Sequence, residues 1–390
     1  MMDFDFINPT RIVFGEGKEK EVGSLLSNYG YKKALLVYGG GSIKRSGLYD
    51  VIVESLKEAK IAFLELSGIK ANPDVSFVKE GLSIVRKNPV DVILAIGGGS
   101  VIDVAKSVAV SYFYKGDPLD FNRHRLAPNR ALPIAVILTI ASAGSESSDS
   151  CVISSYEEDF KGGFNSPLVR PFLAIEDPVL LKTVPLRQRN AGIVDMMMHS
   201  MERFFAKSNP FQLADDWSLS LIKNVKNAAK TLLNYQNNMD ALAALMLDSS
   251  LAHDGLTSLG KKPCFVVHPL EHALSGYNPH IIHGEGIAVC YLGWSRYVYK
   301  QDLAKFSRLA RFVFDIKENN DEKAAIMGIE AMEAFYKELQ VPCSLKELGL
   351  FSKDIPSLTN LATGNGTRVI GCYPQSLNKE DVEKIYNLCL

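Results

Sequence analysis

Histidines mark the residues of this chain that are best suited to metal chemistry. Four of its seven histidines lie between residues 268 and 283, namely His268, His272, His280 and His283. Asp195 and His199 are four residues apart in a stretch with helical periodicity, so both side chains point from one face. Imidazole nitrogens with one carboxylate make a site suited to iron or zinc, and an open coordination position would bind a substrate oxygen. One such pair alone is usually a structural feature, but the combination indicates a metal site.

Two glycine loops indicate phosphate binding. Gly97-Gly98-Gly99-Ser100 follows a predicted strand and precedes a predicted helix. Without Cβ atoms the backbone approaches a pyrophosphate closely, and the N–H groups at a helix N-terminus hold its charge. Gly39-Gly40-Gly41-Ser42 has the same place after an earlier strand. A single triplet can be only a tight turn, whereas two such loops suit an extended dinucleotide. Neither loop matches G-x-G-x-x-G, so this is not the standard Rossmann fingerprint.

The elements that must position these residues differ between the two halves of the chain. Before Pro185 short apolar runs alternate with amphipathic segments; strands are predicted at 33–38, 61–66, 91–96, 131–139, 151–155 and 172–175, and helices at 51–59 and 74–86. This alternation predicts a mostly parallel sheet covered on both faces. After Pro185 the periodicity is helical, at 191–205, 212–233, 241–259, 287–299 and 322–339. We therefore predict an α/β dinucleotide-binding domain at 1–185 and an all-helical metal-binding domain at 186–390, with the site in a cleft between them.

Composition excludes several other classes. The 390 residues are 47% hydrophobic, enough for two cores, and a formal net charge of -1 argues against a nucleic-acid partner. The N-terminus lacks the basic and apolar regions of a secretory signal, and the longest apolar stretch, 131–140, is too short to span a membrane. None of the six cysteines forms a C-x-x-C motif, so we expect reduced thiols in a cytoplasmic protein.

The motifs, taken in order, resemble the iron-containing alcohol dehydrogenase family, especially its branch of butanol dehydrogenases and broad aldehyde reductases. The resemblance covers nearly the whole chain. It rests on the segments 8–15, 38–44, 97–103, 144–146 and 174–178, on Asp195-x-x-x-His199 and on His283-Gly284-Glu285-Gly286. It implies an N-terminal dinucleotide-binding α/β domain and a C-terminal helical domain, in a dehydroquinate synthase-like architecture, and a homodimer.

The resemblance also implies a role for individual residues. The metal ligands would be Asp195, His199, His268 and His283, and the metal Fe²⁺ or Zn²⁺. His272 would be a non-ligand histidine that relays a proton. Cofactor binding would fall to Gly39, Gly40, Gly41, Ser42, Gly97, Gly98, Gly99, Ser100, Asp103, Thr139 and Lys161, of which Thr139 and Lys161 match positions near the nicotinamide. The implied reaction is reversible hydride transfer between the nicotinamide and a small alcohol or aldehyde.

Two departures from the family pattern bear on these roles. His268 and His283 are fifteen residues apart, one more than is usual. The extra residue falls in the loop-like stretch 276–279 and leaves His280 as a rival ligand, although the Gly-Glu-Gly after His283 favours His283. Ala143 stands where close relatives carry a threonine near the nicotinamide, so one hydrogen bond to the cofactor is expected to be missing.

Two other functions remain open at this point. One is a sister activity on the same scaffold, such as a polyol or sugar-phosphate dehydrogenase or a metal-dependent cyclase. A phosphorylated substrate would need a basic cluster, of which only Lys161 is recognisable. The other is a dinucleotide-binding regulator without turnover, which would be expected to lose metal ligands, and all four are present.

The loop 39–45 favours NADP(H) over NAD(H). NAD-selective sites usually place an acidic side chain against the ribose hydroxyls, and this loop contains no Asp or Glu. Its small residues leave room for a 2′-phosphate, which Ser42 and backbone N–H groups would bind, aided by Lys44 or Arg45. The simpler interpretation is that Lys44 and Arg45 only face solvent. Cells generally keep NADPH reduced, so we expect aldehyde reduction to be the favoured direction.

Overall fold

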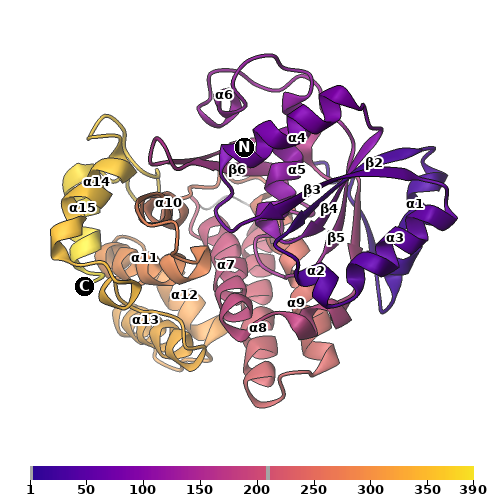
Figure 1. Ribbon diagram of the computed structural model, residues 1–390. Coiled ribbons are helices and arrows are strands. Elements are labelled where there is room, and N and C mark those ends of the chain that lie inside the picture. Colours follow the sequence, from indigo (N-terminus) through magenta and orange to yellow (C-terminus); the bar gives the residue numbers. More distant parts are fainter. Residues whose placement is uncertain (1–2, 208–210) are drawn as a thin grey trace. The chain divides into compact units, whose positions relative to one another are not determined.

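The computed structural model describes residues 3–207 and 211–390, which divide into two compact units (Figure 1). The first, here called the sheet unit, consists of Ile7–Val184 and Asn237–Asp254. The second, here called the helical unit, consists of the described residues within Met1–Phe6, Pro185–Gln236 and Gly255–Leu390. The units are interleaved along the chain, whereas the sequence suggested a single division at residue 185, because a later helix packs with the sheet.

Six parallel strands form the sheet. Their order is β1 (Arg11–Phe14), β8 (Leu173–Glu176), β5 (Ile134–Leu138), β4 (Val92–Gly97), β2 (Lys33–Gly39) and β3 (Ala62–Ile69). Every residue of β4, β5 and β8 is buried. Continuous apolar runs of this kind suit strands whose two faces are both covered. The predicted parallel sheet is therefore confirmed.

Helices cover both faces of the sheet (Figure 1). On one face α1 (Val22–Asn28) and α3 (Leu48–Glu58) share a buried core with side chains of β2 and β4. On the other face lie α4 (Val75–Lys87) and α5 (Gly99–Ser111), which contact each other and the strands β3 and β4. The N–H of Ser76 donates to the Asp74 side chain, which caps α4. The predicted helices at 51–59 and 74–86 correspond to α3 and α4.

Smaller elements complete the sheet unit. They are the helices α2 (Ser42–Arg45) and α6 (Leu119–Asn122), the 3₁₀ helices η1 (Lys18–Glu21), η2 (Pro167–Val169) and η3 (Pro178–Thr183), and the antiparallel pair β6 (Ser150–Ser155) and β7 (Phe160–Asn165). The sequence did not predict β1 or β7. β1 has only four residues, and β7 contains Gly162-Gly163, which are poor strand formers.

Helix α9 (Met239–Ala252) belongs to the sheet unit although its neighbours in sequence do not. The Ser142 N–H, in the loop after β5, donates to Ser249 Oγ at 3.1 Å. The Ser250 hydroxyl bonds to Glu146 at 2.8 Å and to Glu176, the last residue of β8, at 2.7 Å. These buried bonds fix α9 against the loop that follows β5. The apolar, helix-favouring sequence of α9 predicts a helix but not the surface against which it packs.

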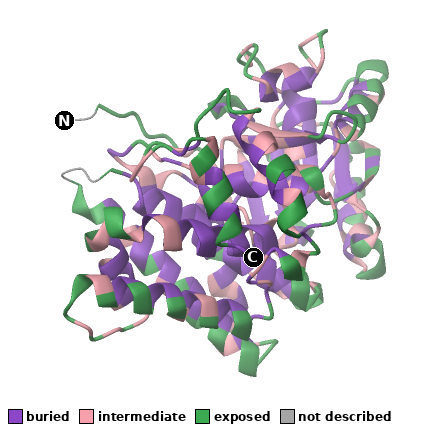
Figure 2. Ribbon diagram, turned by 90° about the vertical axis from the view of Figure 1, so that its left-hand side faces the viewer, coloured by how far each residue is buried: buried purple, intermediate pink, exposed green. Residues whose placement is uncertain are grey.

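Helices make up the second unit. They are α7 (Leu186–Phe204), α8 (Gln212–Asn234), α10 (Val267–Tyr277), α11 (His283–Val298), α12 (Leu303–Val313), α13 (Asp321–Glu338), α14 (Ile355–Thr363) and α15 (Lys379–Asn387), with the 3₁₀ helices η4 (Leu256–Ser258), η5 (Tyr299–Gln301), η6 (Lys346–Leu348) and η7 (Ser352–Asp354). No strand occurs among its described residues, as expected, and one isolated bridge joins Ile370 and Leu377. Every residue of α7 from Arg189 to Phe204 is buried. Other helices carry exposed residues on their outer surfaces (Figure 2).

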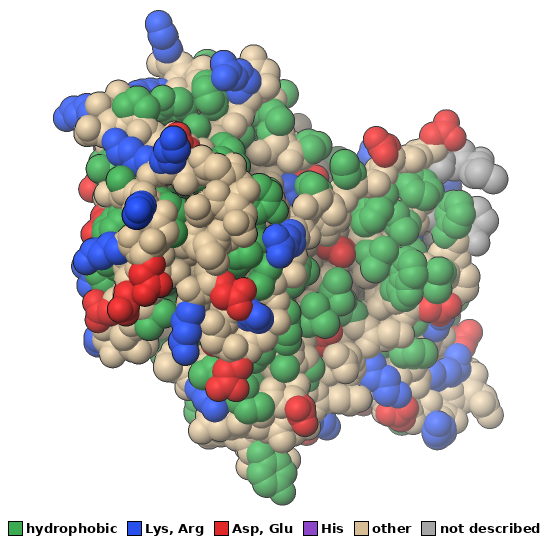
Figure 3. All heavy atoms as spheres, turned by 90° about the vertical axis from the view of Figure 1, so that its right-hand side faces the viewer, with side chains coloured by type: hydrophobic (Ala, Val, Ile, Leu, Met, Phe, Trp, Pro, Cys, Tyr) green, Lys and Arg blue, Asp and Glu red, His purple; other side chains and the backbone are tan. Residues whose placement is uncertain are grey.

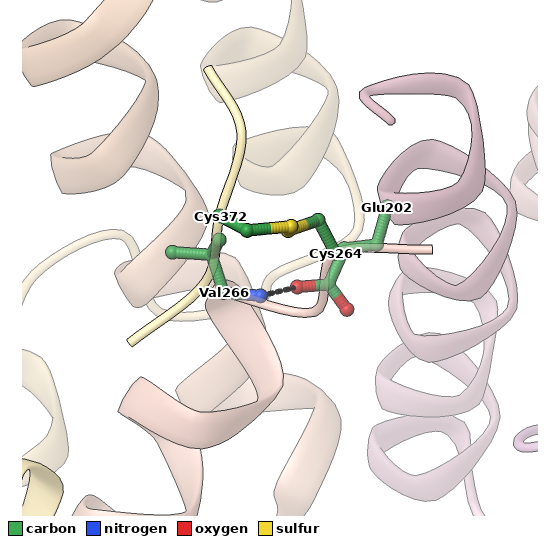
Figure 4. Close-up of a disulfide and its surroundings, with 4 residues drawn as sticks. All are labelled: Glu202, Cys264, Val266 and Cys372. Atoms are coloured by element: carbon green, nitrogen blue, oxygen red, sulfur yellow. Dashed lines mark hydrogen bonds between the residues drawn. A yellow bond between two sulfur atoms is a disulfide. The ribbon is translucent and has the colours of Figure 1, made fainter. Parts of the chain in front are cut away.

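A disulfide in the helical unit overturns one expectation. Cys264 and Cys372 are joined, with their Cα atoms 5.7 Å apart, so the prediction that all six cysteines are reduced thiols is wrong (Figure 4). The two are separated by 108 residues, so no short spacing motif could have paired them. The other four cysteines, Cys151, Cys290, Cys343 and Cys389, are free and buried.

The described part of the chain contains no helix that combines the length and the apolar character needed to cross a bilayer. On the face shown in Figure 3, basic and acidic side chains are interspersed, in keeping with the near-zero net charge.

Candidate metal centre and nicotinamide site

Three helices of the helical unit supply the candidate metal ligands. α7 carries Asp195 and His199 one turn apart, α10 carries His268 in its first turn, and α11 begins at His283. The i, i+4 spacing predicted for Asp195 and His199 therefore lies on a real helix face. α10 was not among the predicted helices, because its short run Val267–Tyr277 is interrupted by Pro269 near its start.

The donor atoms of Asp195, His199 and His268 lie within 4.8 Å of one another, and His283 approaches the same Asp195 oxygen. Asp195 Oδ1 lies 3.4 Å from His199 Nε2, 3.5 Å from His268 Nε2 and 3.8 Å from His283 Nε2. Ligands that bind one tetrahedral Zn²⁺ at about 2.0–2.1 Å stand about 3.3–3.4 Å from each other, so the spacing is close to that of a coordination sphere. Asp195, His199 and His268 are buried, while the His283 side chain is 27% exposed. The donor set thus fits a divalent cation that is open on the His283 side.

Two buried glutamates orient the histidine rings. His268 Nδ1 contacts a carboxylate oxygen of Glu202, and His283 Nδ1 contacts one of Glu271. Each glutamate is almost fully buried, so it favours a proton on Nδ1 and leaves the Nε2 lone pair for a metal. Neither glutamate was predicted from the sequence. Each orients a ring on a different helix, Glu202 that of His268 and Glu271 that of His283, so spacing along one helix could not have identified them.

Electrostatics at His268 also fit a bound cation. Burial disfavours the charged ring, but the carboxylates of Glu202 and Asp195 outweigh burial and raise the pKa of His268 to about 9. The surroundings therefore favour positive charge at this ring. A divalent cation on Nε2 supplies that charge in place of a proton, which makes metal binding and proton binding compete.

The remaining histidines of the cluster occupy different positions. The rings of His272 and His283 have centroids 5.7 Å apart, and Glu271, His272 and His283 also offer donor atoms within 4.8 Å of one another. His272 is thus beside the four-residue cluster and half-buried. His280 is exposed, and its backbone N–H donates to the Asn278 side chain. The described residues form two groups of possible ligands, one of Asp195, His199 and His268 and one of Glu271, His272 and His283, and His280 belongs to neither. His283 Nε2 lies 3.8 Å from Asp195 Oδ1, which supports His283 as the fourth ligand.

The two glycine loops lie at the carboxyl ends of adjacent parallel strands of the sheet unit. Gly39–Ser42 spans the end of β2 and the start of α2, and Gly97–Ser100 spans the end of β4 and the start of α5. From β2 the chain proceeds outward to β3 and then returns to β4 on the other side, so β2 and β4 flank the topological switch point. Ligands of open α/β sheets bind at that point. The structure therefore brings the two predicted loops together.

Close packing explains the glycines of the second loop. A Cβ on Gly98 would lie 2.1 Å from Ile140 Cγ2, and one on Gly97 would lie 2.6 Å from Val101 Cγ2. Helix α5 starts directly after Gly98, so its first N–H groups face the carboxyl edge of the sheet. In the first loop a Cβ on Gly40 would meet no atom within 4 Å, which leaves open space beside the backbone.

The other predicted cofactor residues take up distinct positions near that edge. Thr139 follows β5, and its N–H donates to Gly97 O at 3.1 Å, which ties it to the second loop. Lys161, on β7, donates to the Asn72 side chain at 3.0 Å, just beyond the end of β3. Asp103 instead accepts hydrogen bonds from Ser145 Oγ and the Val152 N–H, so it also holds the loop before β6 against α5.

Lys44 is partly engaged by neighbouring aromatic side chains. Its Nζ lies 4.6 Å from the centre of the Tyr49 ring and 5.4 Å from that of Tyr38. Both tyrosine hydroxyls donate to Glu65. Lys44 is nevertheless exposed, so it keeps a charged group beside the first loop. The carboxylate of Glu65 also acts electrostatically on Lys44 in this loop.

Comparison with known proteins agrees with the motifs. The family model described as "Iron-containing alcohol dehydrogenase" matches residues 9–178, and the model described as "Fe-containing alcohol dehydrogenase family, C-terminal" matches residues 190–390. A probable NADH-dependent butanol dehydrogenase of Bacillus subtilis is 38% identical over the full length of both chains. The NADPH-dependent aldehyde reductase YqhD of Escherichia coli is 29% identical over 95% of both chains. The crystal structure of NADH-dependent butanol dehydrogenase A from Thermotoga maritima has a TM-score of 0.95 and 34% identity, covering 100% of this chain and 99% of that one.

Proposed function

Since the chain belongs to the iron-containing alcohol dehydrogenase family, we propose a specific division of labour for its NAD(P)-linked alcohol dehydrogenase and aldehyde reductase activity. Asp195, His199, His268 and His283 hold one divalent metal, and the two glycine loops hold the dinucleotide. The observation that carries this proposal is the convergence of three imidazole Nε2 atoms on one Asp195 oxygen. Small alcohols and aldehydes are the proposed substrates.

The helical unit prepares the reacting oxygen of the substrate. A bound Fe²⁺ or Zn²⁺ supplies Lewis-acid polarisation of that oxygen. Asp195 and the three histidines leave room for it on the side of His283, the most exposed of the four side chains. Glu202 and Glu271 keep the His268 and His283 rings oriented.

His272 is the proposed proton carrier. It is half-buried, and its ring stacks obliquely near that of His283, which places it next to the proposed metal without being one of the four ligands. Hydride transfer to an aldehyde produces an alkoxide, which must take up a proton to leave as an alcohol. An imidazole can give that proton near neutral pH, directly or through a water molecule or a ribose hydroxyl.

The sheet unit binds the dinucleotide. Gly97–Ser100 and the first turn of α5 are proposed to hold the pyrophosphate, because free N–H groups at a helix N-terminus favour negative charge. Thr139 and Lys161 are proposed to contact the nicotinamide portion, with Asp103 supporting the loop before β6. Gly39–Ser42 then receives the adenosine ribose.

We further propose that this ribose carries a 2′-phosphate, so that NADP(H) is preferred to NAD(H). Support comes from the acid-free loop 39–45, the open space at Gly40 and the exposed charge of Lys44. The named relatives include both NADH and NADPH enzymes. The negative charge of Glu65, near Lys44, would oppose binding of the 2′-phosphate. The test compares kcat/KM for NADPH and NADH with butanal in wild type and in Gly40→Asp. Better use of NADPH by wild type, and a shift toward NADH in the variant, are expected. Equal or better use of NADH by wild type would refute the preference.

The proposal as a whole is tested on purified protein with defined metals. Metal-free protein should show no reduction of butanal, and one equivalent of Fe²⁺ or Zn²⁺ should restore it. A panel of alcohols, aldehydes, polyols and sugar phosphates then defines the substrate class. Activity that is insensitive to metal, or confined to phosphorylated substrates, would contradict the proposal.

The proposal also covers the oligomeric state of the protein and its location in the cell. We propose a homodimer, because β1 is an edge strand of the sheet and leaves Phe14 39% exposed. Sedimentation equilibrium, which gives the mass of the assembly, tests this. We propose a cytoplasmic location, because the reaction draws on the nicotinamide pool that cells keep there.

A further inference from the structure

A disulfide stands close to a proposed metal ligand. Cys264 precedes His268 by four residues and is 6% exposed. Its partner, Cys372, is exposed and lies between the bridged residues Ile370 and Leu377, whose backbones exchange two hydrogen bonds at 2.9 Å. The disulfide therefore joins the segment that enters α10 to a surface turn 108 residues later (Figure 4).

One glutamate links that segment to the metal ligand. Glu202 Oε1 accepts hydrogen bonds from the Val266 and Val267 N–H groups, both at 2.6 Å. The other carboxylate oxygen contacts His268 Nδ1. Figure 4 shows Glu202 reaching toward Val266 directly beside the disulfide. The backbone just after Cys264 and the ring of His268 are thus held by the same buried carboxylate.

The surface turn also presses on Val266. Gly371 has φ 68°, and a Cβ built on it would lie 2.4 Å from Val266 Cγ2, so the two residues are in close contact. While the disulfide is intact, Cys372 keeps this turn against Val266, and Val266 keeps its N–H on Glu202. Cleavage of the S–S bond removes the covalent part of that clamp. The turn then keeps the bridge between Ile370 and Leu377 and two side-chain hydrogen bonds, from Tyr373 to Asp302 and from Gln301 to Gln375.

We propose that Cys264 and Cys372 form a redox site, and that reduction of their disulfide by a dithiol loosens the hold of Glu202 on His268 and speeds loss of the metal. The inference rests on the proposed metal site at Asp195, His199, His268 and His283. It assigns a function to a pair of residues with no part in hydride transfer. A disulfide in a compartment whose thiols are kept reduced is typically transient and redox-sensing, so such control would report the thiol state of the cell.

The exchange is a two-electron reaction. A thiolate of the dithiol attacks Cys372 Sγ, the exposed side, forming a mixed disulfide and breaking the bond to Cys264, whose thiolate leaves and takes up a proton. The second thiol of the reagent then attacks the mixed disulfide, giving the oxidised cyclic reagent and the Cys372 thiol. The protein gains two electrons and two protons, and the dithiol loses them. Reoxidation reverses the sequence.

The four remaining cysteines make the redox state easy to count. Because all of them are buried and free, an aromatic disulfide reagent added to native protein should label none in the oxidised form. After treatment with a dithiol and its removal by gel filtration under argon, labelling should rise, with the exposed Cys372 reacting first. Labelling of wild type therefore fixes the state in which each metal measurement is made.

The decisive measurement is the rate at which Zn²⁺ leaves the protein for a chromophoric chelator. Oxidised wild type should first bind one Zn²⁺; a protein that binds none refutes the metal site, and with it the proposed function. Reduced wild type should then release Zn²⁺ about 10-fold faster than oxidised wild type, the lower end of effects seen when support of a metal ligand is lost. Equal release rates would overturn the redox inference and leave the metal site standing.

Variants separate the route from side effects of the reagent. Cys264→Ser/Cys372→Ser should release Zn²⁺ as fast as reduced wild type without any treatment, whereas Cys343→Ser, a matched control far along the chain, should behave as oxidised wild type. In Glu202→Gln release should be fast in both redox states, because the link to His268 is already broken. A double serine variant as slow as oxidised wild type, or a Glu202→Gln protein that keeps the full redox difference, would refute the route. If a variant does not fold, reoxidation of reduced wild type decides, since slow release must return.

Discussion

Replacing Glu271 with glutamine isolates what a buried carboxylate contributes to the proposed metal centre. The Glu271 side chain is fully buried, and its Oε2 contacts His283 Nδ1. Glutamine keeps the shape but removes the charge, so the hydrogen bond to the ring loses its ionic component. Loss of such support typically weakens metal binding by about 10–100-fold. That range corresponds to about 1.4–2.8 kcal/mol of binding free energy.

The assay is competition for Zn²⁺ between the metal-free protein and a chelator of known affinity. Glu333→Gln is the matched control, because Glu333 pairs with Arg296 and Lys337 away from the site. We expect Glu271→Gln to bind Zn²⁺ with a larger dissociation constant than wild type, and the control to bind it with an unchanged one. Affinity equal to wild type in both variants would show that Glu271 does not support the metal through His283, and the reasoning would fail.

Three further predictions follow from the same geometry. His272→Ala should keep its metal but reduce turnover by about 10²–10⁴-fold, seen in steady-state kinetics beside metal analysis; an unchanged rate with chemistry limiting would remove His272 from the mechanism. His283→Ala should lose metal and His280→Ala should not, and the reverse pattern by mass spectrometry would exchange their roles. Burial and the nearby Glu146 carboxylate raise the pKa of Glu176 from 4.5 to about 8, so the folded chain binds a proton there that the unfolded chain has released. As pH rises between these two pKa values, this group lowers the free energy of unfolding by up to about 1.4 kcal/mol per pH unit. In urea titrations, Glu176→Gln should make the free energy of unfolding depend less on pH. An identical pH slope in wild type and variant would contradict this prediction.

Local periodicity was enough to predict several of the elements that carry the site, but not α10, which carries His268 and His272. The strands β2 and β4 and the loops after them are apparent from apolar runs that end in glycine triplets. Asp195 and His199 could be placed on one helix face by spacing alone. What joined them to His268 and His283 was the resemblance to a family, because spacing within a helix says nothing about which helices meet.

The parts that the sequence did not reveal depend on contacts between distant residues. Cys264 and Cys372 meet only because a late turn packs on the start of α10, and a reduced state was the reasonable expectation for scattered cysteines. Glu202 and Glu271 resemble any other helical glutamate until the rings that they orient are known. Helix α9 was predicted, but its association with the sheet depends on buried bonds to Glu146 and Glu176.

The central claim, one metal on Asp195, His199, His268 and His283, is tested most directly by crystallography of Zn²⁺-loaded protein at the zinc absorption edge. We predict a single strong anomalous peak at about 2.0–2.2 Å from the three Nε2 atoms and an Asp195 oxygen, with Glu202 and Glu271 on the far sides of the His268 and His283 rings. A peak bound by His280, or no peak at these four residues, would contradict the account.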